Sequence, residues 1–415
     1  MTTRTSRLVA RAPRSYAWWV LATAMLTTVA TIPGQTVGVS VFLDYILEDL
    51  GASRSTVSLL YTVGTLLASF ALPFVGRRID RHGPRVAVGV IAGLFALACV
   101  WMAGVQSLWM LAVGFILIRG LGQGSLSLVS LHVVNLWFVK RRGLAVGMTG
   151  LGMAIATAVV PSLLERLIDA LGWRAAYAIL AGIVASVALP LGVTFFRSAP
   201  ERYGVTPDGY RAPERDATPA REVNLTLGQA RRTSAFWIVA GSGVTIAALS
   251  TGQVFHHFDI VAQAGVDRLG AAAIFLPLGL AAAGANLSSG VLLDRFPPRY
   301  LIMVMLTLQA AALLFAAWLP AAWVLAYGAV LGAAQGMNGA VSGAVYATYF
   351  GRVHIGAIKG FATTLTVAGT AVGPWAFALG RDAAGLYGPV LIGSAVIPLA
   401  LAIAAWWMRP PRRAP

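Results

Sequence analysis

The pattern G-x-x-x-D-R-x-x-P-R occurs twice in this sequence, as Gly76-Arg-Arg-Ile-Asp80-Arg81-His-Gly-Pro84-Arg85 and as Gly290-Val-Leu-Leu-Asp294-Arg295-Phe-Pro-Pro298-Arg299. The five shared positions are all 214 residues apart. Further matches follow at offsets of 212 or 213: Gly120, Gln123, Gly124, Phe138, Pro161, Asp169 and Gly172 correspond to Gly332, Gln335, Gly336, Phe350, Pro374, Asp382 and Gly385. Self-similarity of this extent indicates a chain built from two homologous halves.

The composition places both halves in a membrane. Of the 415 residues, 58% are hydrophobic and 11% are charged, with a mean hydropathy of +0.76, whereas about a quarter of the residues of soluble domains are charged. A spanning helix needs about 20 mostly apolar residues. Twelve stretches meet this requirement: residues 16–42, 53–76, 85–106, 107–138, 143–165, 173–196, 234–259, 269–293, 300–319, 321–350, 360–381 and 386–408. The predicted fold is therefore an all-α membrane protein with twelve transmembrane helices in two six-helix halves.

One long polar segment, residues 197–233, separates the halves. Its prolines and mixed charges are typical of a cytoplasmic linker, and its end, Thr226-Leu-Gly-Gln-Ala, predicts a short N-capped surface helix. The predicted domains are residues 1–196, the linker 197–233 and residues 234–415. Because each half holds an even number of helices, the two halves share one orientation, as parallel repeats do.

The basic residues are distributed unevenly along the chain. The net charge is +16, and 25 of the 31 Lys and Arg residues lie on the side of the N-terminus. The opposite loops contain five arginines and eight acids: Arg54, Arg166, Arg174, Arg268 and Arg381, with Asp44, Glu48, Asp49, Glu165, Asp169, Asp259, Asp267 and Asp382. By the positive-inside rule both termini are cytoplasmic. The basic excess therefore indicates topology and contact with anionic lipid, not nucleic acid.

The first apolar span is too long for a cleavable signal sequence, so it is expected to stay in the membrane. The expected location is the cytoplasmic (inner) membrane. Cys99 is the single cysteine, so neither an intrachain disulfide nor a cysteine metal cluster can form. We predict no cofactor and no metal site. Sequence motifs of hydrolases, zinc proteases and nucleotide-binding loops are lacking, which disfavours a membrane-embedded enzyme; a receptor without transport activity is a further alternative.

The duplicated motif and the helix pattern resemble the major facilitator superfamily over nearly the whole chain. The hallmark of that family, G-x-x-x-D-R-x-G-R-R between helices 2 and 3, is matched by Gly76, Asp80, Arg81, Gly83 and Arg85, while Pro84 replaces one basic residue. The resemblance implies a site near the membrane midplane and a cytoplasmic gating latch, expected to lie against helix 11 after Lys359. The expected gating residues are Gly76, Asp80, Arg81, Arg85, Asp294 and Arg295. Purely topogenic charges are the alternative, although acids contribute little to orientation.

Three further segments resemble the monocarboxylate transporter and oxalate/formate antiporter branch, namely Trp137-Phe-Val-Lys-Arg-Arg-Gly-Leu-Ala-Val-Gly147, Gly172-Trp-Arg-Ala-Ala-Tyr177 and Tyr349-Phe-Gly-Arg-Val-His-Ile-Gly-Ala-Ile-Lys-Gly360. The stretch from Thr226 to Trp237 is similar as well. The sequence departs from the monocarboxylate pattern because helix 1 has no lysine, the interior of helix 8 has no Asp–Arg pair, and helix 11 has no basic residue before Arg381. A charged substrate would then depend on Arg119 alone, which disfavours dianions such as oxalate.

Arg119 is expected to be the only ionisable residue deep in a predicted span. It follows Ser107 by 12 residues, or about 18 Å of helix, and so lies near mid-depth. A cation there is costly and is a functional candidate by default. Gln123 lies one turn on along the same face, and nearby glycines permit close packing. A purely structural arginine, satisfied by carbonyl groups, is the alternative interpretation.

In the second half, Gln253, His256 and His257 are expected to share a face of helix 7, and His256 is a candidate for the coupled proton. His257 is only two residues from Asp259 and the outer surface, so solvation at the membrane surface is an equal alternative to a functional role for His257. The remaining candidates for ligand contact, each of which could instead join helices, are Gln35, Tyr61, Asn286, Gln335 and Asn338. His132, near the inner end of helix 4, is expected to be structural or to act in gating.

The sequence predicts a secondary active transporter that moves a small organic acid, a monocarboxylate, with protons as the coupling ion and alternating access as the mechanism. Arg119 is assigned to substrate and proton coupling, and His256 to the proton. The expected partners are a small-molecule substrate, protons and membrane lipid, and the protein is expected to act as a monomer. The alternative is a drug or metabolite efflux antiporter with a largely apolar cavity.

Overall fold

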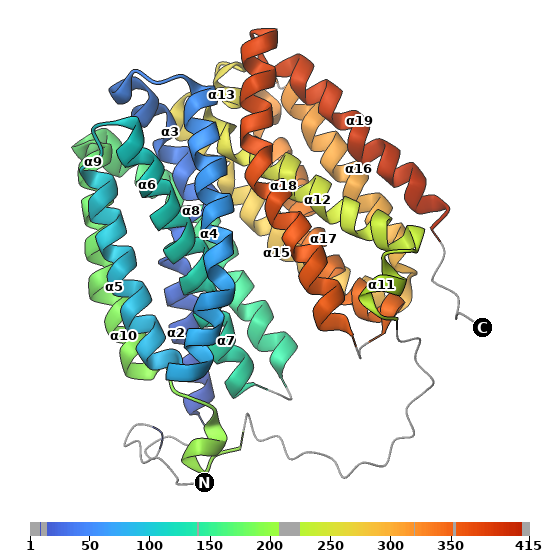
Figure 1. Ribbon diagram of the computed structural model, residues 1–415. Helices are drawn as coiled ribbons and strands as arrows, with labels where there is room; N and C mark the ends of the chain where they lie inside the picture. The colour runs from blue at the N-terminus through green and yellow to red at the C-terminus, as the bar shows by residue number, and fades with distance from the viewer. Residues whose placement is uncertain are drawn as a thin grey trace. The chain divides into compact units, whose positions relative to one another are not determined.

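The structure, a computed structural model, describes residues 9, 15–138, 141–206, 225–318, 320–351 and 354–408. All regular secondary structure in these residues is helical, which confirms the predicted all-α class. The chain divides into two compact units (Figure 1). Unit 1 contains residues 1–52 and 63–216, and unit 2 contains residues 53–62 and 217–415.

Ten helices in the described part of the chain are long and apolar enough to cross a membrane. They are Arg54–Ile79, Pro84–Ala103, Leu108–Trp137, Leu144–Leu171, Trp173–Phe195, Ser234–Phe255, Arg268–Leu293, Pro298–Ala317, Ala357–Ala384 and Tyr387–Trp406. The other two predicted spans, 16–42 and 321–350, correspond to a broken first helix and to a 27-residue helix, Val324–Phe350.

Unit 1 follows the predicted helix order, but three of its described spans are interrupted, the first by a break and the fourth and sixth by π-helical segments. Its elements are α2 (Tyr16–Val29), η1 (Ile32–Gly34), α3 (Thr36–Leu50), most of α4 (Arg54–His82), α5 (Pro84–Ala103), α6 (Leu108–Ile118), η2 (Arg119–Leu126), α7 (Ser127–Trp137), α8 (Arg142–Leu171), α9 (Trp173–Ile183), η3 (Val184–Ala188), α10 (Leu189–Phe195) and η4 (Pro200–Tyr203). The first span breaks at Pro33-Gly34, where proline removes a backbone donor. The fourth span widens into a π-helix, η2.

Unit 2 begins with the short helix predicted at the end of the linker. Its elements are α11 (Leu227–Ala230), α12 (Ser234–Phe255), α13 (His257–Ala262), α14 (Arg268–Ala273), α15 (Phe275–Arg295), α16 (Pro298–Ala317), η6 (Ala321–Trp323), α17 (Val324–Phe350), α18 (Ile355–Ala384) and α19 (Tyr387–Trp406). Thr226 and Gln229 form a reciprocal capping box at the start of α11, which confirms the predicted N-capped helix.

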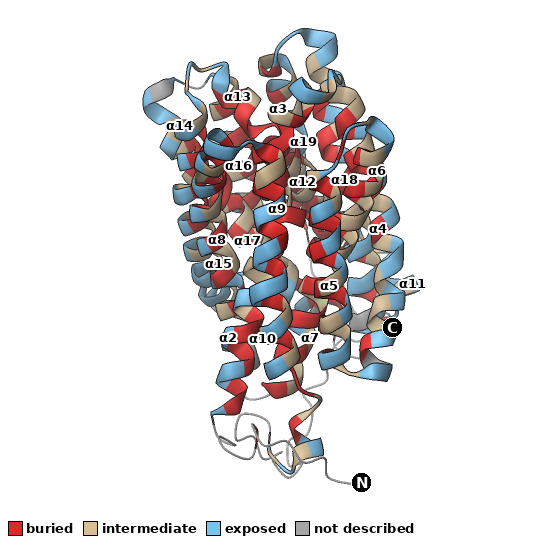
Figure 2. Ribbon diagram, turned by 90° about the vertical axis from the view of Figure 1, so that its left-hand side faces the viewer, coloured by how far each residue is buried: buried red, intermediate tan, exposed pale blue. Residues whose placement is uncertain are grey.

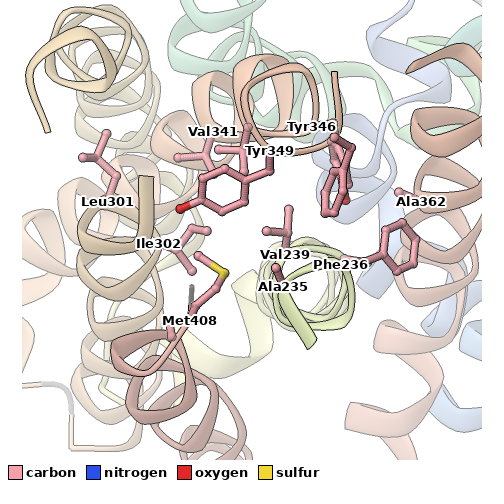
Figure 3. Packing of buried hydrophobic residues seen from close by; sticks show 14 of the residues in the cluster. Ala235, Phe236, Val239, Leu301, Ile302, Val341, Tyr346, Tyr349, Ala362 and Met408 are labelled. Carbon is pink, nitrogen blue, oxygen red and sulfur yellow. The ribbon is translucent and has the colours of Figure 1, made fainter. Parts of the chain in front are cut away.

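An aromatic and aliphatic core lies beside α11 in unit 2 (Figure 3). The Phe236 ring lies 6.5 Å from that of Tyr346 and 6.0 Å from that of Phe350. Leu225, two residues before α11, donates its backbone N–H to the carbonyl of Phe350, the last residue of α17. This core orients α12, whose far end carries part of the candidate site.

Large apolar side chains also cover the outward faces of the helices, where Figure 2 shows exposed residues alternating with buried ones. Phe70, Leu97, Trp109, Ile403 and Trp406 are all more than half exposed. Exposed apolar surface on this scale matches helices whose outer faces contact lipid.

Glycines allow α15 and α17 to lie in close contact. An added Cβ at Gly332 would collide with the backbone carbonyl of Leu278, and one at Gly336 with the carbonyl of Ala282. Such small residues allow two helix backbones to approach closely inside a membrane.

Gly336→Ala is expected to destabilise the protein by about 1–3 kcal/mol, because the new methyl group has no room between α15 and α17. Gly343→Ala on the same helix is the matched control, since nothing lies within 4 Å of its added Cβ. Thermal unfolding in detergent measures both. Equal melting temperatures for the two variants would show that the backbones do not pack this closely.

Asp49 and Arg174 join α3 to α9. Arg174 donates hydrogen bonds to both carboxylate oxygens of Asp49, at 2.7 and 2.6 Å, and to the carbonyl of Val105 at 2.8 Å. The hydrogen bond from Arg174 lowers the pKa of the Asp49 carboxyl below its ordinary value. The stabilisation from this pair is therefore present above about pH 4, the unfolded pKa, and is lost as the pH falls through the lower folded value.

Asp49→Asn is expected to lower the melting temperature at pH 7, and the difference from wild type should shrink below about pH 4. The effect should not exceed about 1 kcal/mol, because both side chains are about a third exposed. Thermal scans of the two proteins across pH measure it. A difference that is constant across pH would contradict the ion-pair explanation.

Candidate functional site

Arg119 begins η2, the π-helical segment of the fourth span. Its sequence, Arg-Gly-Leu-Gly-Gln-Gly-Ser-Leu, contains three glycines, and Ser125 donates its hydroxyl to the carbonyl of Gly120. Insertions of this kind widen a helix by one residue and are frequent at functional sites. The widened turn places Arg119 inside unit 1, where its side chain is 2% exposed.

Two oxygen atoms from different elements hold the guanidinium of Arg119. Its Nε donates to the hydroxyl of Thr65 on α4 at 3.0 Å, and its Nη1 donates to the carbonyl of Gly34 in η1 at 2.9 Å. Both of these acceptors are neutral. The helical stretches that supply them, residues 16–34 and 54–79, contain no acidic residue, and neither does the span of Arg119 itself, residues 108–137.

The break at Pro33-Gly34 lies directly against η2. An added Cβ at Gly34 would collide with the carbonyl of Ile118 and would lie 3.2 Å from the backbone nitrogen of Gln123, so only glycine fits. Gln35 is the next residue, and its Nε2 donates to the Thr31 hydroxyl at 2.9 Å. Unit 1 thus gathers three predicted site residues, Arg119, Gln123 and Gln35, around one helix break.

The Gln123 side chain has a buried Oε1 without a hydrogen-bond partner among the described residues. The repeat-related residue of unit 2, Gln335, has a buried Nε2 in the same condition. A buried amide atom without a partner is costly. These two atoms are therefore candidates for contact with a polar ligand or water.

A second group of predicted residues lies where α15 meets α17. Asn286 donates its Nδ2 to the carbonyl of Gly336 at 3.1 Å, and the Asn338 side chain accepts from Ser342 at 3.2 Å. Gln335 precedes Gly336 on the same helix. Leu331 occupies the position that corresponds to Arg119 and is fully buried, so the described polar groups here are neutral amides and hydroxyls.

Gln253, His256 and His257 do not share one face, which corrects the prediction made from their spacing. α12 ends at Phe255, and the chain bends at His256 before α13. Gln253 donates to Ala312 on α16, His256 to Pro374 on α18, and His257 to Ala271 on α14. His257 is fully buried, so it is not solvated at the membrane surface. Tyr61 is also buried, with its ring centroid 4.5 Å from that of Phe255.

The gating motif is described only in part. Arg81, Arg85 and Arg295 are exposed, and Gly76 has open space where a Cβ would lie. The side chains of Asp80 and Asp294 lie outside the described residues, so the predicted latch rests on the sequence. Gly83 has a φ of 83° directly before α5, a backbone conformation that explains the glycine of the motif.

Two residues of the interior were missed by the sequence analysis. Thr65 was overlooked although Ser58, Thr62, Thr65 and Ser69 recur along α4 at helical spacing, which signals a polar face. Glu165 was placed in a loop, but it lies within the span Leu144–Leu171, is 4% exposed, and accepts a hydrogen bond of 2.6 Å from the Tyr45 hydroxyl. Arg119 is therefore not the only ionisable residue buried in a span.

Comparison with known proteins finds one family model, described as Major Facilitator Superfamily, that matches residues 19–374. Human "Monocarboxylate transporter 6" is 31% identical over 176 residues, which are 42% of this chain and 34% of that protein. "Oxalate:formate antiporter" of Oxalobacter formigenes is 22% identical over 222 residues, 54% of this chain and 50% of that protein. The match thus spans about a third to a half of each relative.

Among solved structures, a bacterial homolog of the human lysosomal transporter Spinster, in an inward-facing and occupied conformation, shares the fold. Its TM-score is 0.71 at 17% sequence identity, and the match covers 94% of this chain and 95% of that one. At this identity the similarity concerns the fold alone.

Thr65→Val is expected to destabilise the protein by about 1–3 kcal/mol, because it leaves the buried Nε of Arg119 without its acceptor. Thr65→Ser, which keeps the hydroxyl, is the matched control and should remain close to wild type. Thermal unfolding in detergent measures both variants. A Thr65→Val protein as stable as Thr65→Ser would mean that this hydrogen bond does not hold the guanidinium.

Proposed function

The chain belongs to the major facilitator superfamily of membrane transporters, and from that premise we propose that it is a proton-coupled carrier of a small monocarboxylate in the cytoplasmic membrane. Its cycle is alternating access, in which a binding site is exposed to each side of the membrane in turn. Both termini lie in the cytoplasm, and the functional unit is the monomer.

One observation carries the substrate class, namely the burial of the Arg119 guanidinium in unit 1 beside the break in the first span. A guanidinium presents several N–H donors in a planar fork, which matches the geometry of a carboxylate. Thr65 and Gly34 take one donor atom each, which fixes the plane of the fork. A single buried cation of this kind suits a monoanion.

The names of several relatives refer to the broader class of organic anions. The monocarboxylate and oxalate:formate transporters are accompanied by a "Probable L-galactonate transporter" of Escherichia coli and a "Probable sulfoacetate transporter SauU" of Cupriavidus necator. All of these names refer to organic anions. Gln123 and Gln35 lie beside Arg119 and are proposed to orient the rest of the ligand, and Tyr61, Gln253, Asn286, Gln335 and Asn338 are proposed to supply further polar contacts.

His256 is the proposed proton carrier, together with Arg119. Its Nε2 lies 2.7 Å from the carbonyl of Pro374, and because a carbonyl can only accept, Nε2 carries the hydrogen. This fixes the tautomer of the neutral ring and makes Nδ1 the basic nitrogen. Protonation of the ring would then accompany binding of the anion.

Arg119→Gln is expected to reduce accumulation of a monocarboxylate at least tenfold, because the neutral amide cannot pair with the anion. The measurement is uptake of radiolabelled lactate, pyruvate and propionate into proteoliposomes under an inwardly directed proton gradient, with the outside acidic. Arg119→Lys keeps the charge without the fork and should retain part of the activity. If Arg119→Gln took up the monocarboxylates as well as wild type, the assignment of Arg119 to the carboxylate would be refuted. If both proteins transported lipophilic cations, the efflux antiporter would be favoured instead.

A further inference from the structure

A cluster of polar side chains lies inside unit 2, where α12, α16 and α17 meet. Its members are Gln253, Gln309 and Tyr327, which we call the amide–tyrosine cluster, and His257 of α13 lies beside it; all four side chains are fully buried. Gln309 donates its Nε2 to Oε1 of Gln253 at 2.7 Å. Gln253 in turn donates its Nε2 to the carbonyl of Ala312 at 3.2 Å. One pair of amides therefore joins α12 to α16.

Three polar atoms in this region have no hydrogen-bond partner among the described residues. They are Oε1 of Gln309, the hydroxyl oxygen of Tyr327 and Nδ1 of His257. The Gln253 side chain faces the Tyr327 hydroxyl, and the rings of His257 and Tyr327 are stacked, with centroids 6.0 Å apart. Each buried polar atom costs free energy unless a partner bonds to it. Three such atoms around one amide pair point to a common partner.

The first half of the chain shows that the fold does not need polar side chains at these positions. By the repeat, Gln309 corresponds to Phe95, 214 residues earlier, and Tyr327 corresponds to Phe115, 212 residues earlier. Both phenylalanines are fully buried. Because apolar rings fill the corresponding positions in one half, the amide and the hydroxyl of the other half are a costly departure, and a bound polar group would offset that cost.

The unpartnered atoms define the chemistry of their partner. The amide oxygen of Gln309 can only accept a hydrogen bond, whereas the Tyr327 hydroxyl can donate and accept. His257 has its Nε2 2.9 Å from the carbonyl of Ala271, so Nε2 carries the hydrogen and Nδ1 is an acceptor. A cation would need a counter-charge in this interior, but α12, α16 and α17 contain no acidic residue. The chemistry therefore favours a small neutral donor.

We propose that the amide–tyrosine cluster binds a water molecule inside unit 2. The water donates one hydrogen bond to Oε1 of Gln309 and accepts one from the Tyr327 hydroxyl, and its second hydrogen is available to Nδ1 of His257. Buried waters typically make about three hydrogen bonds of this kind to polar groups that would otherwise lack partners. This site is separate from the proposed function, since no step of transport enters the argument.

Tyr327→Phe tests the proposal through the sign of a stability change. If the hydroxyl binds water, its loss removes a hydrogen bond and should lower the melting temperature in detergent by about 1–4 °C. If the hydroxyl is unpaired in a dry interior, its loss removes a costly polar group and should raise the melting temperature. Tyr346→Phe is the matched control, because it removes a hydroxyl from the same helix outside the cluster, and it should remain close to wild type.

A melting temperature of Tyr327→Phe equal to or above that of Tyr346→Phe would overturn the proposal. A cryo-EM map that resolves ordered water is the second measurement, and it should show density within hydrogen-bond distance of both Gln309 Oε1 and the Tyr327 hydroxyl. A map without that density would also overturn it.

Melting temperatures in sodium, potassium and choline chloride should agree. A rise with one cation that disappears in Tyr327→Phe would show that the site holds a cation and not water. None of these measurements needs a substrate. A protein that transports no monocarboxylate but gives the expected results would therefore refute the proposed function and leave the water site standing.

Discussion

A guanidinium buried among apolar helices is the constraint on which unit 1 depends. Its burial is costly unless its donors find acceptors, and the regular backbone of a helix offers no spare carbonyl in its interior. Pro33 and Gly34 end the first helix early and so expose the Gly34 carbonyl that Arg119 uses. The helix break and the polar face of α4 thus supply the acceptors for the guanidinium, and the π-helical turn positions Arg119 to reach them.

The two halves keep the same scaffold but differ in charge. Gln123 and Gln335 occupy corresponding positions, and each has a buried amide atom without a partner in the described part of the chain. Leu331 stands where Arg119 would be expected by the repeat. Duplication therefore accounts for the glycines and amides that the two halves share. Divergence at one position means that, of the two corresponding residues, Arg119 in unit 1 is charged and Leu331 in unit 2 is not.

Two threonines of α4 donate or accept hydrogen bonds with different elements. Thr62 and Thr65 are three residues apart, or about 4.5 Å along the helix axis. Thr62 nevertheless bonds to Ala371 in unit 2, whereas Thr65 bonds to Arg119 in unit 1. The polar face of α4 therefore supplies both a donor to a backbone carbonyl and the acceptor that holds the residue proposed to bind the anion.

The sequence alone determined the helical class, most of the spans, the duplication and the choice of Arg119 as a candidate site residue. The length of apolar stretches, the repeated motifs and a charge within an apolar stretch can all be read from the order of the residues. It also predicted the cap at Thr226, which depends on residues three apart. Only the tertiary structure decided which atoms meet: Thr65 with Arg119, Tyr45 with Glu165, and three different partners for Gln253, His256 and His257. The reason is physical, since spacing along a helix predicts a face only while the helix stays regular, and the bend at His256 and the π-helical turn at Arg119 both change the direction in which side chains point.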